Sequence, residues 1–246
     1  TTEIYTLSLH DALPISFLVN MPQTMAKTME TQGITQAFSI CCGDITGEAQ
    51  NTVTWKSWFD DLTKSGIGSK AAVQVAIGNH ERHGNNDGKI FGEYYPYDYK
   101  PYYYYSFNYS SVHVTVLDPW NEETGWGKID DAQIAWLDQD LNNSQSMKYK
   151  IVALHPPPVS GSKPTDDLKA AVELFDKYGV DAVFFGHDHD FAISKINSTN
   201  YFLIGVGGNL GEVPTGFVQA DVSSAQLSLV MHWSNGTVQK LANISG

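Results

Sequence analysis

The sequence predicts an α/β fold in which short apolar strands alternate with amphipathic helices and a β-rich segment closes the chain. Apolar runs recur between residues 37 and 185, and the order strand, helix, strand favours crossovers that feed a largely parallel sheet. After His189 the pattern changes to short alternating runs separated by Gly, Asn and Ser turns. The 246 residues, 42% of them apolar, suffice for one large core, and no linker or repeat divides them.

The individual elements follow from side-chain periodicity. Methionines at four-residue spacing after Pro22 indicate a first helix, and Trp55, Trp58 and Leu62 share one face of a second. We expect helices over residues 22–30, 54–64, 130–141 and 166–178. We expect strands over residues 37–42, 73–77, 112–117, 150–154, 182–185, 192–196, 201–206, 217–222, 227–233 and 237–241.

A tyrosine-rich stretch over residues 94–109 allows two interpretations. It could form an aromatic wall that stacks a sugar or base near a site, or residues 102–107 could be a strand with one packed and one solvated face. The strand is the favoured interpretation.

Composition excludes several classes of protein. The formal charge is −12 and Arg82 is the sole arginine, which argues against binding along a nucleic-acid backbone. Every apolar run is interrupted well before the roughly eighteen residues that a membrane-spanning helix needs. Cys41 and Cys42 are adjacent, so they provide no disulfide framework.

Residues 1–15 read TTEIYTLSLHDALPI and have no clear amphipathic period or signal-peptide pattern. Their back-translation matches one reading frame of a widely used short-read sequencing adapter. We therefore interpret residues 1–15 as an artefact, residues 16–246 as the native domain, and any natural start before Ser16 as lost. His10 and Asp11 are accordingly set aside as site candidates.

Four expected strands end in polar clusters, and these carry the functional signal. The clusters are Gly-Asp at 43–44, Gly-Asn-His-Glu at 78–81, His-Pro-Pro at 155–157 and Gly-His-Asp-His at 186–189. The carboxyl ends of strands are where α/β sheets place their sites, so we expect the four clusters to converge. Several imidazoles with one carboxylate and one amide oxygen suit first-row transition metals better than magnesium or calcium.

The ordered set of clusters resembles the calcineurin-like metallophosphoesterase superfamily, and most nearly its purple-acid-phosphatase-like members. The resemblance covers roughly residue 17 to the C-terminus. It implies a four-layer α/β/β/α sandwich with two mixed sheets. It also implies a metal-dependent phosphoric ester hydrolase that uses a metal-bound hydroxide at a dinuclear site. Phosphomonoesters are the first expectation for its substrate class, and phosphodiesters or nucleotides are the second.

The resemblance also implies a role for each site residue. Asp44 resembles the carboxylate that bridges the two metals, and His80 resembles the histidine that approaches the scissile phosphate, so these two are the catalytic candidates. The metal-ligand candidates are Asp44, Asn79, His155, His187 and His189. Of these, His189 resembles a ligand of the first metal, and Asn79, His155 and His187 resemble ligands of the second.

Two departures from the family pattern qualify this interpretation. The family's first strand ends in Asp-x-His, which this chain lacks, so we expect the first strand to be missing or replaced and the first metal to keep only Asp44 and His189. The position of the iron-binding tyrosine holds Gly47, which leaves the identity of the two metals open among zinc, manganese and iron. The alternative function is a truncated, weakly active or inactive metal-binding remnant.

The expected partner is a small phosphate-ester substrate, with no nucleic-acid track and no membrane, and the sequence does not define the oligomeric state. Five Asn-x-Ser/Thr sequons, at Asn108, Asn142, Asn197, Asn235 and Asn243, fit an extracellular or cell-envelope protein, whose signal peptide, if it has one, is not in this sequence.

Overall fold

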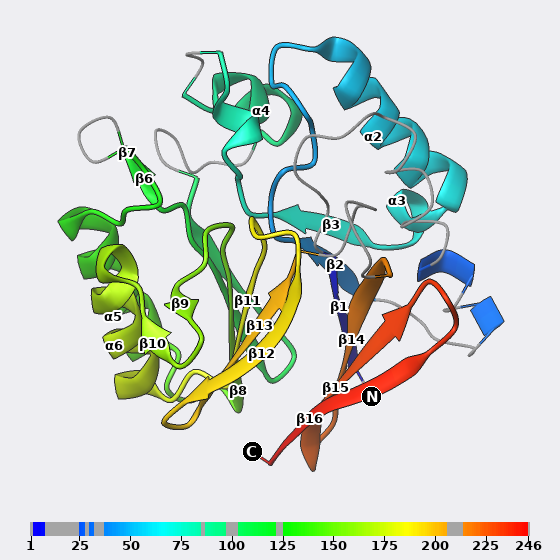
Figure 1. The fold of residues 1–246 in the computed structure, drawn as a ribbon. Helices are drawn as coiled ribbons and strands as arrows, with labels where there is room; N and C mark the ends of the chain where they lie inside the picture. Colours follow the sequence, from blue (N-terminus) through cyan, green and yellow to red (C-terminus); the bar gives the residue numbers. More distant parts are fainter. Residues whose placement is uncertain are drawn as a thin grey trace.

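The chain forms two six-stranded mixed sheets that pack face to face between outer helices (Figure 1). The computed structural model describes residues 2–7, 25–27, 30–31, 37–84, 87–96, 103–121, 125–205 and 214–245. Of the first expected helix, residues 25–27 are helical and most of the remainder lies outside the described residues.

The first sheet has the strand order β16-β15-β14-β1-β2-β3. Its strands are β1 (Thr2–Leu7), β2 (Phe38–Cys41), β3 (Ala72–Val75), β14 (Gly216–Val222), β15 (Gln226–Trp233) and β16 (Val238–Ser245). Strands β1, β2 and β3 pair in parallel, whereas β14 to β16 form an antiparallel meander that joins β1. The expected largely parallel sheet is therefore a mixed one, because the closing hairpins extend it.

The second sheet has the strand order β12-β13-β11-β8-β5-β4. Its strands are β4 (Tyr105–Tyr109), β5 (Val112–Val116), β8 (Tyr149–Ala153), β11 (Ala182–Phe185), β12 (Phe191–Ile196) and β13 (Thr199–Ile204). Strands β5, β8, β11 and β13 are parallel, and the two edge strands are antiparallel. The tyrosine-rich stretch thus contributes an edge strand, as favoured above.

Among the described helices are α2 (Thr52–Ser65), α3 (Ile67–Lys70), α4 (Lys89–Tyr94), α5 (Asp131–Asn143) and α6 (Lys169–Tyr178). Of these, α2 and α5 begin at side-chain caps. Asn51 accepts a hydrogen bond from the Val53 N–H at the start of α2, and Asp130 accepts one from Gln133 at the start of α5. Gly179 ends α6 in the left-handed conformation, which glycine adopts without steric cost. The expected helix 166–178 is divided, since Asp166–Leu168 form a 3-10 turn.

Two short hairpins were not expected from the sequence. They pair β6 (Trp120–Asn121) with β7 (Gly125–Trp126), and β9 (Val159–Ser160) with β10 (Lys163–Pro164). Strands of two residues are too short to show an alternating pattern.

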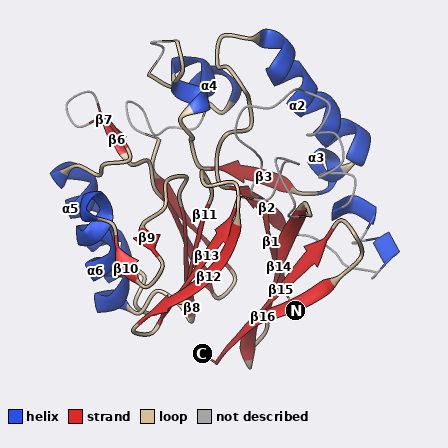
Figure 2. Cartoon of the chain, in the orientation of Figure 1, coloured by secondary structure: helices blue, strands red, loops and turns tan. Residues whose placement is uncertain are grey.

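Three apolar clusters define four layers. The central cluster joins the inner faces of both sheets, for example Ile40 of β2 and Phe184 of β11. Cys41 and Val183, one position along, belong instead to the outer clusters under α2 and under α5 and α6, as the two-residue period of a strand requires. Figure 2 shows the two sheets with helices on both outer sides, which matches the predicted α/β/β/α sandwich. Among the described residues, no helix is long and apolar enough to cross a membrane.

Residues 2–7 occupy the position of a first strand. Strand β1 lies between β14 and β2 and pairs in parallel with β2, with Ile4 opposite Phe38 and Leu7 opposite Cys41. A replacement strand was one of the two expectations for this position. The interpretation of residues 1–15 as an artefact concerns their origin and stays a prediction. His10 and Asp11 lie outside the described residues.

The central layer should dominate the stability of the fold. Phe184 is fully buried between the sheets and stacks on Phe202, with 5.1 Å between ring centroids. We expect Phe184→Ala to lower the free energy of unfolding by about 3–5 kcal/mol, because it leaves a cavity in a layer closed on both sides. Urea denaturation followed by circular dichroism measures the change.

The matched control is Val53→Ala, at a side chain of α2 that is 58% exposed. This variant should stay within about 0.5 kcal/mol of the parent. Equal losses in the two variants would show that the inter-sheet layer is not the core of the fold.

Candidate metal centre

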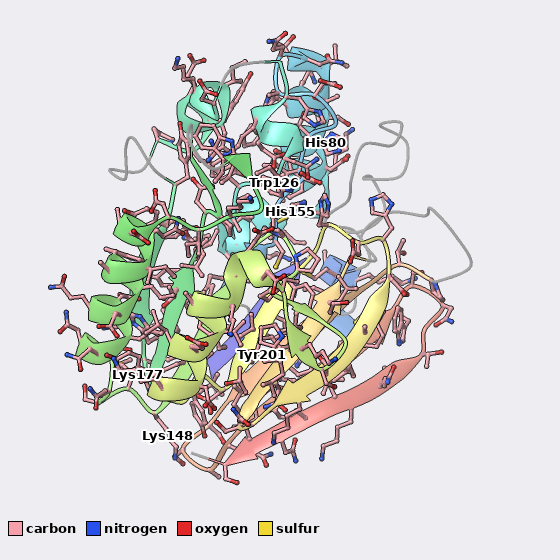
Figure 3. All side chains as sticks on the ribbon, turned by 60° about the vertical axis from the view of Figure 1, so that its left-hand side comes forward. His80, Trp126, Lys148, His155, Lys177 and Tyr201 are labelled. Atoms are coloured by element: carbon pink, nitrogen blue, oxygen red, sulfur yellow. The ribbon has the colours of Figure 1, made fainter. Side chains whose placement is uncertain are left out.

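The predicted site residues lie at the carboxyl ends of parallel strands. Asp44 follows β2, Asn79 follows β3, His155 follows β8 and His187 follows β11. The first two strands belong to one sheet and the last two to the other, so the site forms where the ends of the two sheets meet. Figure 3 labels His155 and His80 in this region.

Four of the predicted ligands form one cluster. The ligand atoms of Asp44, His155 and His187 all lie within 4.8 Å of one another. Asn79 Oδ1 lies 3.1 Å from both His155 Nε2 and His187 Nδ1, and His155 Nε2 lies 2.9 Å from Asp44 Oδ2. Two imidazole nitrogens, an amide oxygen and a carboxylate oxygen thus face one another in a mostly buried site.

The hydrogen bond between His155 and the Cys42 carbonyl decides which ring nitrogen of His155 carries the proton and which has a lone pair directed at the cluster. Nδ1 lies 2.6 Å from the Cys42 carbonyl oxygen, which accepts a hydrogen bond and therefore requires the proton on Nδ1. In the neutral ring, Nε2 then presents a lone pair to Asp44 Oδ2 and Asn79 Oδ1. Three lone pairs at such distances repel unless a proton or a metal ion lies between them, and a backbone carbonyl is the usual outer partner of a metal-ligating histidine. The donor set therefore fits a transition-metal ion.

Asp44 is held in a conformation that few residues adopt. Its φ is 54°, in the left-handed region, and His187 has a φ of 70°. Such backbone conformations are costly for residues other than glycine and concentrate at functional sites. Asp44 Oδ1 accepts a hydrogen bond from the His80 N–H at 3.0 Å, whereas Oδ2 is buried and accepts none from the described residues.

Glu81 joins the two loops of the first sheet. One carboxylate oxygen accepts the N–H groups of Asp44 and Gly78, each at 2.8 Å, and the other accepts that of Thr46 at 3.1 Å. Glu81 is fully buried, and burial raises the pKa of its carboxyl group, while His155 and the backbone N–H groups oppose this. The sequence analysis included Glu81 in the cluster at 78–81 without assigning it a role.

Glycines allow the two loops to approach. A Cβ atom on Gly78 would lie 2.1 Å from Asp44 Oδ1, and one on Gly43 would lie 2.6 Å from His155 Nδ1. Gly43 also has a φ of 94°, a conformation that favours glycine. Both glycines are therefore required by the packing of the cluster.

His80 lies beside the cluster and is mostly buried. Its Nδ1 lies 2.7 Å from the Gly47 carbonyl oxygen, which requires the proton on Nδ1, and its ring lies 4.3 Å from that of His83. His189 lies on the exposed turn after His187 and is not among the residues whose ligand atoms lie within 4.8 Å. Its assignment as a ligand of the first metal stays a prediction.

Arg82 is not a solvated loop residue. Its guanidinium forms a buried ion pair with Asp118 at 2.5 Å and lies 4.0 Å from the ring centroid of Trp120. Burial raises the pKa of the Asp118 carboxyl group, and the charge of Arg82 opposes this. Arg82 thus links the loop that carries Asn79 and His80 to the hairpin formed by β6 and β7.

An aromatic residue that the sequence analysis missed lies over the cluster. The ring centroid of Trp126, in β7, lies 5.5 Å from that of His155 and 5.9 Å from that of His187. The tyrosines considered earlier pack elsewhere, since Tyr94 stacks on Trp55 and Tyr95 accepts a hydrogen bond from Trp58. The one available signal was a tryptophan between two glycines, at residues 125–127.

The four-layer sandwich and the cluster at its strand ends define the metallophosphoesterase class. The model of the calcineurin-like phosphoesterase family matches residues 27–191. The chain therefore belongs to the calcineurin-like phosphoesterase family.

Relatives in sequence agree with this assignment. An uncharacterized protein of Mycobacterium tuberculosis is 26% identical over 212 residues, which cover 74% of this chain and 39% of that protein. Purple acid phosphatase 15 of Arabidopsis thaliana is 28% identical over 178 residues, which cover 63% of this chain and 32% of that protein. The chain thus spans less than two fifths of the length of these relatives.

Solved structures share the fold at low sequence identity. The purple acid phosphatase PPD1 of yellow lupin has a TM-score of 0.75 at 17% identity, and the superposition covers 99% of this chain and 53% of the lupin chain. A dimetal phosphatase of Danio rerio has a TM-score of 0.72 at 13% identity, covering 99% and 98%. GAP50 of Plasmodium, described as the anchor in the inner membrane complex, has a TM-score of 0.74 at 17% identity, covering 100% and 89%.

Gly78 offers a direct test of the packing around Asp44. We expect Gly78→Ala to displace the Asp44 carboxylate and to weaken zinc binding by more than about tenfold, as loss of an orienting contact at a metal site typically does. Zinc affinity is measured by competition with a chromophoric chelator.

The matched control is Gly68→Ala in α3, where the new Cβ would make an ordinary contact 3.4 Å from Leu62. This variant should bind zinc like the parent, and alanine in a helix should preserve or raise stability. Unchanged zinc affinity in Gly78→Ala would contradict the close approach of the two loops.

The Glu81 carboxylate can be tested by an isosteric change. In Glu81→Gln the amide oxygen can replace one carboxylate oxygen, but the amide nitrogen then faces a backbone N–H that has lost its acceptor. We expect the free energy of unfolding to fall by about 1–3 kcal/mol in metal-free protein, because a buried donor is left unsatisfied. Glu93→Gln, at an exposed position of α4, should leave it unchanged. Indistinguishable denaturation midpoints for the two variants would show that the Glu81 carboxylate does not stabilise the two loops.

Proposed function

We propose that this chain is a metal-dependent phosphoric ester hydrolase, with phosphomonoesters as the first substrate class and phosphodiesters or nucleotides next. The observation that carries the proposal is the cluster of Asp44, Asn79, His155 and His187, whose donor atoms face one another at the strand ends. Membership of the calcineurin-like phosphoesterase family and the similarity to a purple acid phosphatase support it.

Asp44, Asn79, His155 and His187 would hold the second metal of the family pattern. A bound transition metal supplies a lowered pKa of a coordinated water and charge neutralisation for phosphoryl oxygens. The protein's contribution is to fix the ligands before the ion binds. The Cys42 carbonyl holds the tautomer of His155, and Glu81 holds the backbone of Asp44.

His80 would act on the leaving group. The Gly47 carbonyl fixes the proton of His80 on Nδ1, so Nε2 is the nitrogen that can exchange a proton. The backbone N–H of the same residue donates to Asp44 Oδ1, so the histidine and the proposed bridging carboxylate are held together. A protonated Nε2 could donate to the oxygen of the departing alcohol.

The alternative is a metal-binding remnant with little or no activity. Of the first metal's ligands, Asp44 lies in the cluster and His189 lies on an exposed turn, so a dinuclear site needs further donors. The fold by itself does not decide, because it is shared by a dimetal phosphatase and by a protein described as an anchor. Elemental analysis separates the two proposals, since the enzyme predicts close to two metals per chain and the remnant at most one.

The net charge of the chain supports the proposed substrate class, and the exposed sequons support the proposed location. The formal charge of −12 favours a small phosphate ester over a nucleic-acid strand. The asparagines of all five sequons are exposed, which fits glycosylation of an extracellular or cell-envelope protein.

Asn79 tests the proposed ligand set. We expect Asn79→Ala to lower zinc affinity and the hydrolysis of p-nitrophenyl phosphate by at least about tenfold, because it removes one of four donors around the ion. Metal titration and a colorimetric assay measure the two effects.

The matched control is Asn142→Ala, at an exposed asparagine in α5 whose side-chain oxygen accepts a hydrogen bond from Gln145. It should match the parent in both assays. Metal-dependent hydrolysis that survives Asn79→Ala unchanged would mean that the site is assigned wrongly.

A further inference from the structure

Trp126 covers one side of the proposed metal centre. Its ring lies at 55° to that of His155 and at 46° to that of His187, with the centroid distances given above. Trp126 as a whole residue is partly buried. Figure 3 labels Trp126 close to His155, at the end of the sheets where His80 also lies. Both centroid distances lie within the 4.5–7 Å range of aromatic contacts, so the indole packs against both histidine rings.

The backbone on both sides of Trp126 is adapted to present this ring. Gly125 and Gly127 have φ values of 76° and 81°, in the left-handed region that favours glycine. A Cβ atom on either glycine would meet no atom within 4 Å, so packing does not demand these glycines. Their conformational freedom explains them, because it lets the hairpin turn sharply before and after a single aromatic residue.

The base of the hairpin is fixed to the loop that carries the proposed ligands. Trp120 pairs with Trp126 across the hairpin and lies against the Arg82 guanidinium. Arg82 in turn is held by the buried carboxylate of Asp118, and the Gly127 N–H donates to the Pro119 carbonyl at 2.9 Å. Because Arg82 lies two residues after His80 in the chain, the same ion pair links the loop of the proposed site to the hairpin.

We propose that Trp126 is a substrate-binding residue that stacks on the leaving group, so that the site prefers phosphate esters whose leaving group carries an aromatic ring. This inference rests on the proposed function, because it takes the phosphoryl group to be bound at the cluster of Asp44, Asn79, His155 and His187. A leaving group that extends from that phosphorus past the histidine rings would meet the indole. An alkyl leaving group gains less there, because it has no π face.

Binding of two phosphonates tests the proposal without requiring turnover. Phenylphosphonate and methylphosphonate present the same charged group and differ in the ring, and neither is hydrolysed. Their dissociation constants are measured by isothermal titration calorimetry on the zinc-loaded full chain, its Trp126→Ala and Trp126→Phe variants, and the control Trp136→Ala. Trp136 packs against Tyr104 from α5 and contributes nothing to the cluster.

We expect the parent to bind phenylphosphonate about two- to tenfold more tightly than methylphosphonate, the range expected for one aromatic contact. Trp126→Ala should abolish this preference by weakening phenylphosphonate binding more than methylphosphonate binding. Trp126→Phe should retain part of the preference, and Trp136→Ala should retain all of it.

A preference for phenylphosphonate that persists in Trp126→Ala overturns the assignment. An equal loss of affinity for both phosphonates also overturns it, because Trp126 would then only support the two histidines. A parent that binds zinc but neither phosphonate overturns the proposed function itself, and with it this inference.

Discussion

The Glu81 carboxylate is the interaction on which the site depends most. It accepts backbone N–H groups from the loops after β2 and β3, and it does so from a position without solvent access. The loops can share one carboxylate only because Gly78 has no side chain to separate them. A buried charge is tolerated where several donors surround it, so the position of Asp44 is set by protein contacts before any metal binds.

Much of the fold could be predicted because its signals are local. The strand expected over residues 182–185 is β11 itself, and the helix expected over 54–64 lies within α2. Both depend on apolar periodicity, which a short window of sequence contains. The convergence of Asp44, Asn79, His155 and His187 was also predictable, since parallel strands deliver their carboxyl ends to a common edge.

The remainder depends on contacts between distant segments. Glu81 acts on backbone groups that lie up to 37 positions away in the sequence, and nothing in its immediate neighbours indicates this. Trp126 lies in a strand of two residues, too short to have a period, and it is linked to the Arg82–Asp118 ion pair only through its cross-strand partner Trp120. For residues 2–7 the sequence left two expectations, a missing or a replaced first strand, and the pairing of β1 with β2 and β14 decides for a replacement.

The burial of Arg82 provides an intrinsic probe for local opening of the loop after β3. It is the sole arginine in the sequence, and its side chain is 6% exposed between Asp118 and Trp120. A dicarbonyl reagent that modifies guanidinium groups has one target, which it reaches only when the base of the hairpin separates from the loop after β3. The rate of that single modification therefore reports the free energy of a local opening at the mouth of the site, without a label or a substitution.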